Sequence, residues 1–434
     1  MIAKKASVIA LSTSLLGLVA AGCGSSPSST SAGTSSGHVT ITFMEAMSSG
    51  TLSTTLTSLV SQFEKVHKNI TVKVIPEPSY GVLQTKIEAT VSANNAPTIA
   101  QAYEDWAAGY VKSGVITPLS SYANGPNGLT AAQKADFWPG IWQDQFLNDK
   151  LWMFPFNKSD FVMYYNQNWL TKDNLPVPTT WSQFATVAQR VTSSSANTWG
   201  VSIDPGSSSE AANGTYLYVS LIRAYGGHLM ANGKPNFDSQ AAQSALKYLV
   251  SLYHSGALKL GTNYPGQAAL GSSHSPFDLS TIASYYYNQQ AIGGKFTLGV
   301  APFPKGPAGQ GNVLQGTNIV MFSSATTAQK NAAWTFMKWL TEPQNTAYWA
   351  THTGYLPVRK SAVSLMQSYY NSHPYQKIAA QSLAYAREVP PIAGFSQAIG
   401  ALANAIQEAT VGHEAVGLAL KQAQSQAVQD LANQ

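Results

Sequence analysis

Residues 39–76 read VTITFMEAMSSGTLSTTLTSLVSQFEKVHKNITVKVIP, and this stretch contains the pattern that decides the fold. Apolar and polar residues alternate from Val39 to Phe43, which is the period of a half-buried strand. Apolar residues then recur at helical spacing from Leu52 to Phe63, and a second alternation covers Ile70 to Val74. A strand, a helix and a second strand in direct succession predict a βαβ unit and therefore a parallel sheet.

The same two patterns continue along the chain beyond this unit. Apolar faces at helical spacing predict further helices, the first introduced by a capping box of Thr180 and Gln183. These helices cover residues 181–191, 246–253, 333–340 and an Ala-rich tail from about 396 to 431, and strands are predicted near 296–301 and 313–322. The mixture predicts an α/β chain with more than one lobe.

The first 37 residues indicate export. Lys4 and Lys5 precede a short apolar run from Ala6 to Val19, which is too short to span a bilayer as a stable helix. Small residues lead to Cys23, the only cysteine of the chain, and a Ser/Gly-rich tract follows. This pattern predicts a lipoprotein signal over 1–22, acylation of Cys23 and a tether over 23–37. An ordinary signal peptide with an incidental cysteine is the alternative. Either way the protein is expected outside the cytoplasm, and the lipoprotein would be anchored to the outer face of the membrane or lie in the periplasm.

The composition excludes some partners. Charged residues make up 10% of the chain, against about 25% in typical globular proteins. The formal net charge is +5, but the basic residues are scattered, which argues against a nucleic-acid or lipid-surface binder. We hypothesise that the low charge reflects an acidic exterior.

The sequence contains no motif that requires an enzyme. Its eight histidines have no metal-ligand spacing, and neither a GxSxG elbow nor a P-loop is present. Glu104 and Asp105 are adjacent, so a solvated or hydrogen-bonding pair is favoured over two carboxylates flanking a glycosidic bond. We therefore predict no catalytic residue, metal or cofactor. The 21 tyrosines and 10 tryptophans instead suit recognition of sugars and polyols, although most must belong to the core.

Several segments, taken in order, resemble the extracellular solute-binding proteins of ABC importers, and the resemblance covers nearly all of the chain after the tether. Within that family they are most similar to members that bind glycerol-3-phosphate and, more distantly, to those that bind maltose. The segments are PSY (78–80), APTIAQAYE (96–104), PFNKS (155–159), MYYN (163–166), TW (180–181), GVAPFP (299–304), QGTN (315–318) and TGYLPV (353–358).

This resemblance implies a two-lobed type II periplasmic-binding-protein fold with a three-segment hinge and a central ligand cleft. The crossings would lie near Pro155–Asp160, Pro302–Pro304 and Tyr355–Pro357. Lobe 1 would comprise 38–156 and 303–354, and lobe 2 would comprise 157–302 and 355–434. A monomer of this kind would capture a small polyhydroxylated solute by lobe closure and deliver it to a membrane permease.

The resemblance also implies a set of ligand-binding residues. They are Tyr80, Glu104, Ser159, Trp181, Ser284, Gly316, Tyr355 and Ser396. Ser396 departs from the family, because glycerol-3-phosphate binders carry an arginine near this position and sugar binders a stacking aromatic. Lys158 or Arg387 could replace the arginine, so glycerol-3-phosphate, a glycerophosphodiester and a mono- or oligosaccharide all stay open as ligands. A secreted carbohydrate-active hydrolase and a surface binding protein without a transport role are the alternative functions.

Overall fold

The βαβ unit predicted from residues 39–76 is present in the computed structural model, which describes residues 37–206 and 213–433. Strand β1 (Val39–Glu45) pairs in parallel with β2 (Ile70–Pro76), with Val39 opposite Ile70 and Glu45 opposite Pro76. Helix α1 (Gly50–Val66) connects them and buries the apolar face that the spacing predicts. The predicted signal, Cys23 and all of the tether except Gly37 lie outside the described residues.

The βαβ unit belongs to a seven-stranded mixed sheet. Its strands follow the order β11, β6, β13, β3, β1, β2, and β12 also pairs with β6. The additional strands are β3 (Ile99–Ala102), β6 (Phe154–Asn166), β11 (Phe277–Thr281), β12 (Leu298–Pro302) and β13 (Leu314–Met321). The pairs β1–β2 and β1–β3 are parallel, whereas β13 is antiparallel to both β3 and β6.

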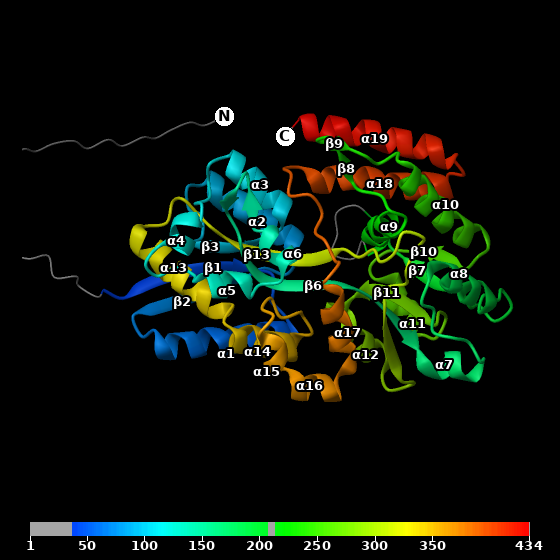
Figure 1. The fold of residues 1–434 in the computed structure, drawn as a ribbon, viewed down its shortest axis with the longest axis horizontal. Helices are drawn as coiled ribbons and strands as arrows, with labels where there is room; N and C mark the ends of the chain where they lie inside the picture. Colours follow the sequence, from blue (N-terminus) through cyan, green and yellow to red (C-terminus); the bar gives the residue numbers. More distant parts are fainter. Residues whose placement is uncertain (1–36, 207–212, 434) are drawn as a thin grey trace, which may run out of the picture. The chain divides into compact units, whose positions relative to one another are not determined.

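Strand β6 is shared by two parts of this sheet. Its first half, from Phe154 to Asp160, pairs with β13, and its second half, from Phe161 to Asn166, pairs with β11 and β12. Figure 1 shows β6 running from the β1–β2 side of the fold toward β11. The chain therefore passes from one part of the sheet to the other inside a continuous strand.

The other elements surround this sheet. Short strands form three two-stranded ladders: β4 (Phe146–Leu147) with β5 (Lys150–Leu151), β7 (Val201–Ile203) with β10 (Leu258–Leu260), and β8 (Met230–Ala231) with β9 (Lys234–Pro235). The helices up to residue 190 are α2 (Tyr80–Ser92), α3 (Glu104–Lys112), α4 (Ser120–Asn124), α5 (Ala131–Ala135), α6 (Pro139–Gln143), α7 (Gln167–Lys172) and α8 (Trp181–Arg190). Those that follow are α9 (Asn213–Ala224), α10 (Gln240–His254), α11 (Pro265–Gly271), the 3₁₀ turn η1 (Ile282–Ser284), α12 (Tyr285–Ile292), α13 (Thr327–Leu340), α14 (Pro343–Thr353), α15 (Ala362–Leu365), α16 (Gln367–Ser372), α17 (Pro374–Ser382), α18 (Phe395–Thr410) and α19 (Val416–Ala432).

Two local predictions differ from the structure. The tail forms two helices, α18 and α19, which lie side by side (Figure 1), because the chain turns at 411–415 with His413 at a positive φ of 56°. At the start of α8, Thr180 accepts the Gln183 N–H as expected. The Gln183 side chain, however, accepts from Thr179 instead of Thr180, so the capping box is only half formed. Thr180 is engaged in a bridge with Lys305.

The buried apolar residues form two main core clusters. The first includes Ile41, Phe43 and Phe336, and the second includes Phe184, Leu246 and Leu402. The pleat of β6 divides its side chains between them, since Phe161 and Met163 belong to the second cluster and Val162 and Tyr164 to the first.

The clusters do not follow the lobe limits expected from the sequence. Residues 157–302 were expected in lobe 2, but Val162, Tyr164, Leu270, Ile282, Ile292 and Leu298 pack in the first cluster. Phe303 and Val313 pack in the second cluster, where the Phe303 ring contacts Phe161 and Trp181. Residues from Tyr355 to Ala386 contribute to the first cluster, since α17 packs on β6 and β12. The C-terminal contribution to the second cluster therefore begins with the partly buried Val389 and Ile392, and Phe395 is its first fully buried member.

The chain divides into two units, Met1–Gly37 and His38–Gln434, and the second carries the fold. Among the residues that the structure describes, no helix has the length and apolar character needed to cross a membrane.

Candidate functional site

A cavity of about 1170 Å³ is lined by residues of β6 and β13, by Tyr103 directly after β3 and by the starts of several helices. Seven of the eight ligand-binding residues expected from the sequence line it: Tyr80, Glu104, Ser159, Ser284, Gly316, Tyr355 and Ser396. These residues come from positions far apart in the chain, and the sheet topology brings them together. The cavity volume exceeds the roughly 300–1,000 Å³ of typical small-molecule pockets. A ligand larger than glycerol phosphate would therefore fit.

Trp181 lies elsewhere. It begins α8, is 2% exposed and packs edge to face against Phe184 and Phe303 in the second core cluster. Its backbone carbonyl accepts a hydrogen bond from the Tyr248 hydroxyl at 2.8 Å. The amphipathic pattern of α8 alone would have placed this ring in the core.

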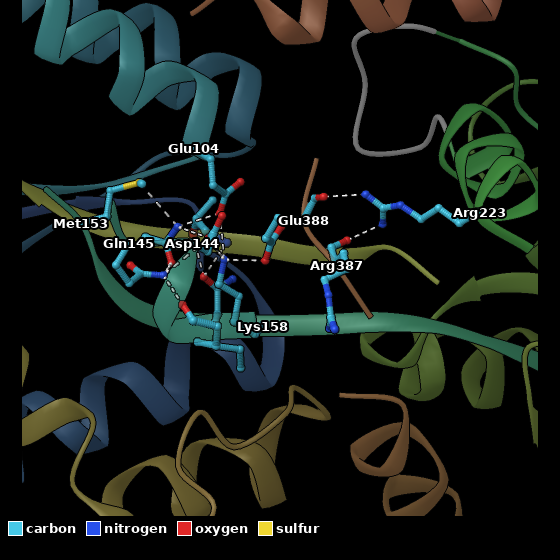
Figure 2. Close-up of polar contacts among 12 residues, drawn as sticks. Glu104, Asp144, Gln145, Met153, Lys158, Arg223, Arg387 and Glu388 are labelled. Atoms are coloured by element: carbon cyan, nitrogen blue, oxygen red, sulfur yellow. Dashed lines mark hydrogen bonds and ion pairs between the residues drawn. The ribbon is translucent and has the colours of Figure 1, made fainter. Parts of the chain in front are cut away.

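Below the cavity, Lys158 joins three carboxylates (Figure 2). Its Nζ lies 2.8 Å from Glu104 Oε1, 3.0 Å from Glu388 Oε1 and 3.2 Å from Asp144 Oδ2. Asn318 donates to the same oxygens of Glu104 and Asp144, at 2.6 and 3.2 Å. The Lys158 side chain is fully buried.

The surroundings set the protonation of this cluster. Burial lowers the pKa of Lys158, but the carboxylates outweigh it and raise that pKa above its ordinary value. For Glu104, burial raises the pKa, but Lys158 and the hydrogen bonds lower it by more than burial raises it. The net pKa of Glu104 is therefore below its ordinary value. Burial, followed by repulsion from Glu104, raises the pKa of Asp144 well above its usual range and that of Glu388 to about 8. At neutral pH the lysine charge is therefore balanced mainly by Glu104.

The three carboxylates are close enough for a metal site, since oxygen atoms of Glu104, Asp144 and Glu388 lie within 4.8 Å of one another. The Lys158 ammonium occupies the cation position between them. A metal ion would have to displace a buried lysine that is bonded to all three groups.

Tyr80 and Tyr355 form one wall of the cavity. Tyr80 begins α2, where Ser79 caps the helix by accepting the Val82 N–H. The Tyr80 hydroxyl accepts a 2.8 Å hydrogen bond from Asn157 Nδ2, and burial, followed by the nearby Tyr355, raises its pKa well above the usual range. Both tyrosines are less than 10% exposed, so only a small part of each side chain is accessible from the cavity.

Position 316 requires a glycine because two strands approach each other closely there. Its φ is 111°, a value that favours glycine, and a Cβ built there would lie 1.9 Å from the carbonyl oxygen of Asn157. The residue pairs with Lys158 across β13 and β6. It thus leaves bare backbone at the cavity wall directly beside the buried ion cluster.

Ser396 contacts Asp105 on the other side of the cavity. The Ser396 hydroxyl and backbone N–H donate to Asp105 Oδ2 at 2.5 and 3.2 Å. Burial raises the pKa of Asp105, and the contacts with Ser396 partly offset this rise. Glu104 and Asp105 therefore form a hydrogen-bonding pair, as the sequence favoured, with Glu104 bonded to Lys158 and Asp105 to Ser396.

Charge is distributed unevenly around the cavity. Its lining contains five acidic residues and, within the described part of the chain, no lysine, arginine or histidine. The acidic residues are Glu88, Glu104, Asp105, Glu388 and Asp430. Neither basic residue proposed to replace the missing arginine reaches it: Lys158 is paired with three carboxylates, and Arg387 donates to the carbonyl of Ala386.

Sequence reasoning missed several residues of the site. Asp144 and Asn318 complete the ion cluster, and Tyr264 and Tyr287 lie at the cavity with 39% and 47% of their surface exposed. Asn318 belongs to the QGTN segment, so its position two residues after Gly316 was a usable signal. Asp144 and Tyr264 lie in segments without a recognisable pattern.

Comparison with known proteins identifies the family. Residues 58–376 match the family described as bacterial extracellular solute-binding protein. The chain belongs to this family. The resemblance expected from the sequence is thereby confirmed, and the relatives of this solute-binding protein are binding proteins for transport.

Two curated relatives share its sequence along most of their length. The sn-glycerol-3-phosphate-binding periplasmic protein of Pectobacterium atrosepticum is 24% identical over 354 residues, which cover 77% of each chain. The protein of the same name from Escherichia coli is 25% identical over 378 residues, covering 79% of this chain and 80% of the relative.

Solved structures show the same fold in this solute-binding protein. The cyclic alpha-maltosyl-1,6-maltose binding protein of Arthrobacter globiformis gives a TM-score of 0.80 at 20% identity, covering 92% of this chain and 100% of its own. The Mycobacterium tuberculosis protein UgpB in complex with glycerophosphocholine gives 0.78 at 20% identity, covering 92% and 99%. These likenesses confirm the predicted type II α/β fold.

Proposed function

We propose that this solute-binding protein is the receptor of an ABC importer, and that it captures a neutral saccharide and delivers it to a membrane permease. The observation that carries the choice of ligand is the cavity lining, which has five carboxylates and no basic side chain among the described residues. Recognition of a phosphate monoester relies on charge-assisted hydrogen bonds from cations. Hydroxyl groups of a sugar, in contrast, can donate to carboxylates and accept from amides and hydroxyls.

Two exposed aromatic rings support the same choice. Tyr264 and Tyr287 are the only aromatic residues among the large exposed apolar side chains of the described region, and both line the cavity. Tyr264 occupies the N-cap position of α11 with a left-handed backbone (φ 58°), which is unusual for a bulky residue and occurs often at ligand sites. Exposed aromatic side chains at a cavity suit the C–H faces of a sugar ring.

The lipid anchor at Cys23 and the extracytoplasmic location belong to this proposal, as do the permease partner and the monomeric state. Seven cavity residues are proposed as ligand contacts: Tyr80, Glu104, Ser159, Ser284, Gly316, Tyr355 and Ser396. Trp181 is proposed instead to support the second core cluster.

The hydrolase alternative has a specific obstacle. A retaining glycosidase needs two carboxylates facing the scissile bond. Glu104 and Glu388 instead direct oxygen atoms to Lys158 Nζ, at 2.8 and 3.0 Å. We therefore propose a binding function without turnover, and aryl glycosides incubated with the protein should stay intact.

The test is thermal unfolding of the purified protein against maltose, trehalose, xylobiose, glycerol-3-phosphate and glycerophosphocholine. A ligand at 100 times its Kd stabilises the native state by about 2.7 kcal/mol, which shifts Tm by several degrees. We expect a shift with a saccharide and none with either phosphate compound. A shift with the phosphate compounds alone would overturn the ligand class. Small-angle scattering with the stabilising ligand should show a smaller radius of gyration, which a surface protein without closure would not.

A further inference from the structure

We propose that Asp105 is a specificity-determining residue that excludes anionic groups from the cavity by occupying the N-terminal end of helix α18. This inference rests on the proposed function, because it explains how a neutral solute is preferred. Asp105 lines the cavity but is itself only 6% exposed.

The start of α18 lacks a cap of its own. Gly394 precedes the helix in a left-handed conformation (φ 74°) and offers no side chain to the first turn. Asp105 Oδ2 takes that place and accepts both the backbone N–H and the hydroxyl of Ser396. A helix start usually receives this bond from its own N-cap residue, but here the acceptor lies 291 residues away in the sequence, in the first turn of α3.

The N-terminal end of α18 is a position that an anionic ligand would prefer. The backbone N–H groups at a helix start carry partial positive charge, and phosphate groups bind there readily. Both Asp105 and Ser396 line the cavity, so this helix end faces the space available to a solute. A phosphate group entering there would have to displace the Asp105 carboxylate, and it would find no basic side chain among the described lining residues.

The contact also reaches from one core cluster to the other. Asp105 follows strand β3, whose Ile99 and Ala102 pack in the first cluster, and Ser396 follows Phe395, which packs in the second. A neutral solute can leave this hydrogen bond intact, whereas an anion competes with it directly. Asp105 therefore discriminates between solutes by their charge. It does so at its contact with Ser396, which joins elements of the two core clusters.

The decisive experiment measures phosphate binding by the full protein and its Asp105→Ala variant. Tm is recorded at pH 7.5 against glycerol-3-phosphate and inorganic phosphate, with potassium chloride at equal ionic strength as the reference. Asp173→Ala is the matched control, because it removes an exposed carboxylate outside the cavity. We expect no saturable response in the wild type or the control. In Asp105→Ala we expect saturable stabilisation and an affinity for glycerol-3-phosphate at least about tenfold higher than in the wild type.

Asp105→Asn covers the case in which the alanine variant does not fold, since it keeps the acceptor oxygen and removes the charge. It should gain phosphate affinity in the same direction. A cap with a purely structural role predicts lower Tm in both variants without any phosphate response, and that result would overturn the inference while leaving saccharide binding by the wild type in place. Tight binding of glycerol-3-phosphate by the wild type would overturn the proposed function as well.

Discussion

The substitution Glu388→Gln should make the stability of this protein less dependent on pH. The pKa of the Glu388 carboxyl rises from 4.5 to about 8 in the folded chain, chiefly because of burial and then because of Glu104. Between these pH values the folded state holds a proton that the unfolded state releases. The free energy of unfolding therefore decreases as pH rises, by up to about 1.4 kcal/mol per pH unit for each such proton.

Other buried acids act in the same direction. Burial raises the pKa of Glu45 to about 7 and that of Asp278 to about 6. The wild type should therefore be more stable at pH 5 than at pH 8, which agrees with the hypothesis of an acidic exterior. The glutamine side chain of the variant would mimic the neutral acid at every pH. Between pH 5 and 7, the free energy of unfolding of the variant should therefore fall less steeply with pH than that of the wild type. The difference in slope corresponds to about one proton, or roughly 1.4 kcal/mol per pH unit.

Urea unfolding followed by tryptophan fluorescence at pH 5, 6, 7 and 8 measures this difference. Asp173→Asn removes an exposed carboxylate and should keep the slope of the wild type. If Glu388→Gln and the wild type show equal slopes, Glu388 does not hold the proton and the protonation assigned to the cluster is wrong. A wild type that gains stability as pH rises from 5 to 8 would contradict the reasoning for all three acids.

Three further substitutions test the site. Lys158→Met leaves buried carboxylates without their cation and should lower the free energy of unfolding by about 3–5 kcal/mol at pH 8. The loss should be smaller at pH 5, where carboxylates that have lost the lysine can take up protons. Urea titration at both pH values measures it, and equal losses would argue against the ion cluster. Gly316→Ala places a Cβ against Asn157 and should cost at least about 2 kcal/mol, seen as a lower Tm, whereas an unchanged Tm would show that the strands can separate there. Tyr264→Ala should weaken saccharide binding about tenfold in calorimetry through loss of ring stacking, with Tyr122→Ala as a control outside the cavity; equal affinities would remove Tyr264 from the site.

The sequence predicted those parts of the fold whose cause is local. The apolar alternation in β1 and the helical spacing in α1 need no distant partner, and both elements were found where the pattern placed them. The tail was predicted as one helix because its Ala-rich composition is helical throughout, and the turn at His413 carries no proline. Thr180 and Gln183 have capping-box spacing, but the Gln183 side chain accepts from the neighbouring Thr179 instead.

The site was predictable only in part, for a related reason. Glu104 and Gly316 lie in segments that the resemblance marks, and the structure places both at the cavity. Lys158 was considered as a free cation, yet two of its three carboxylates, Asp144 and Glu388, belong to segments without a recognisable motif. A charge balance among residues 230 positions apart depends on tertiary packing, and spacing along the chain does not reveal it.

The first core cluster has a consequence for the order in which the chain is made. It joins Ile41, near the beginning of the fold, to Ala386, so synthesis must reach the last eighth of the chain before this core can close. Strands β1, β2 and β3 can pair with one another earlier, but β3 gains its second neighbour only when β13 has been made. An emerging chain of this topology cannot complete its first core until the segment that ends near Ala386 has been made.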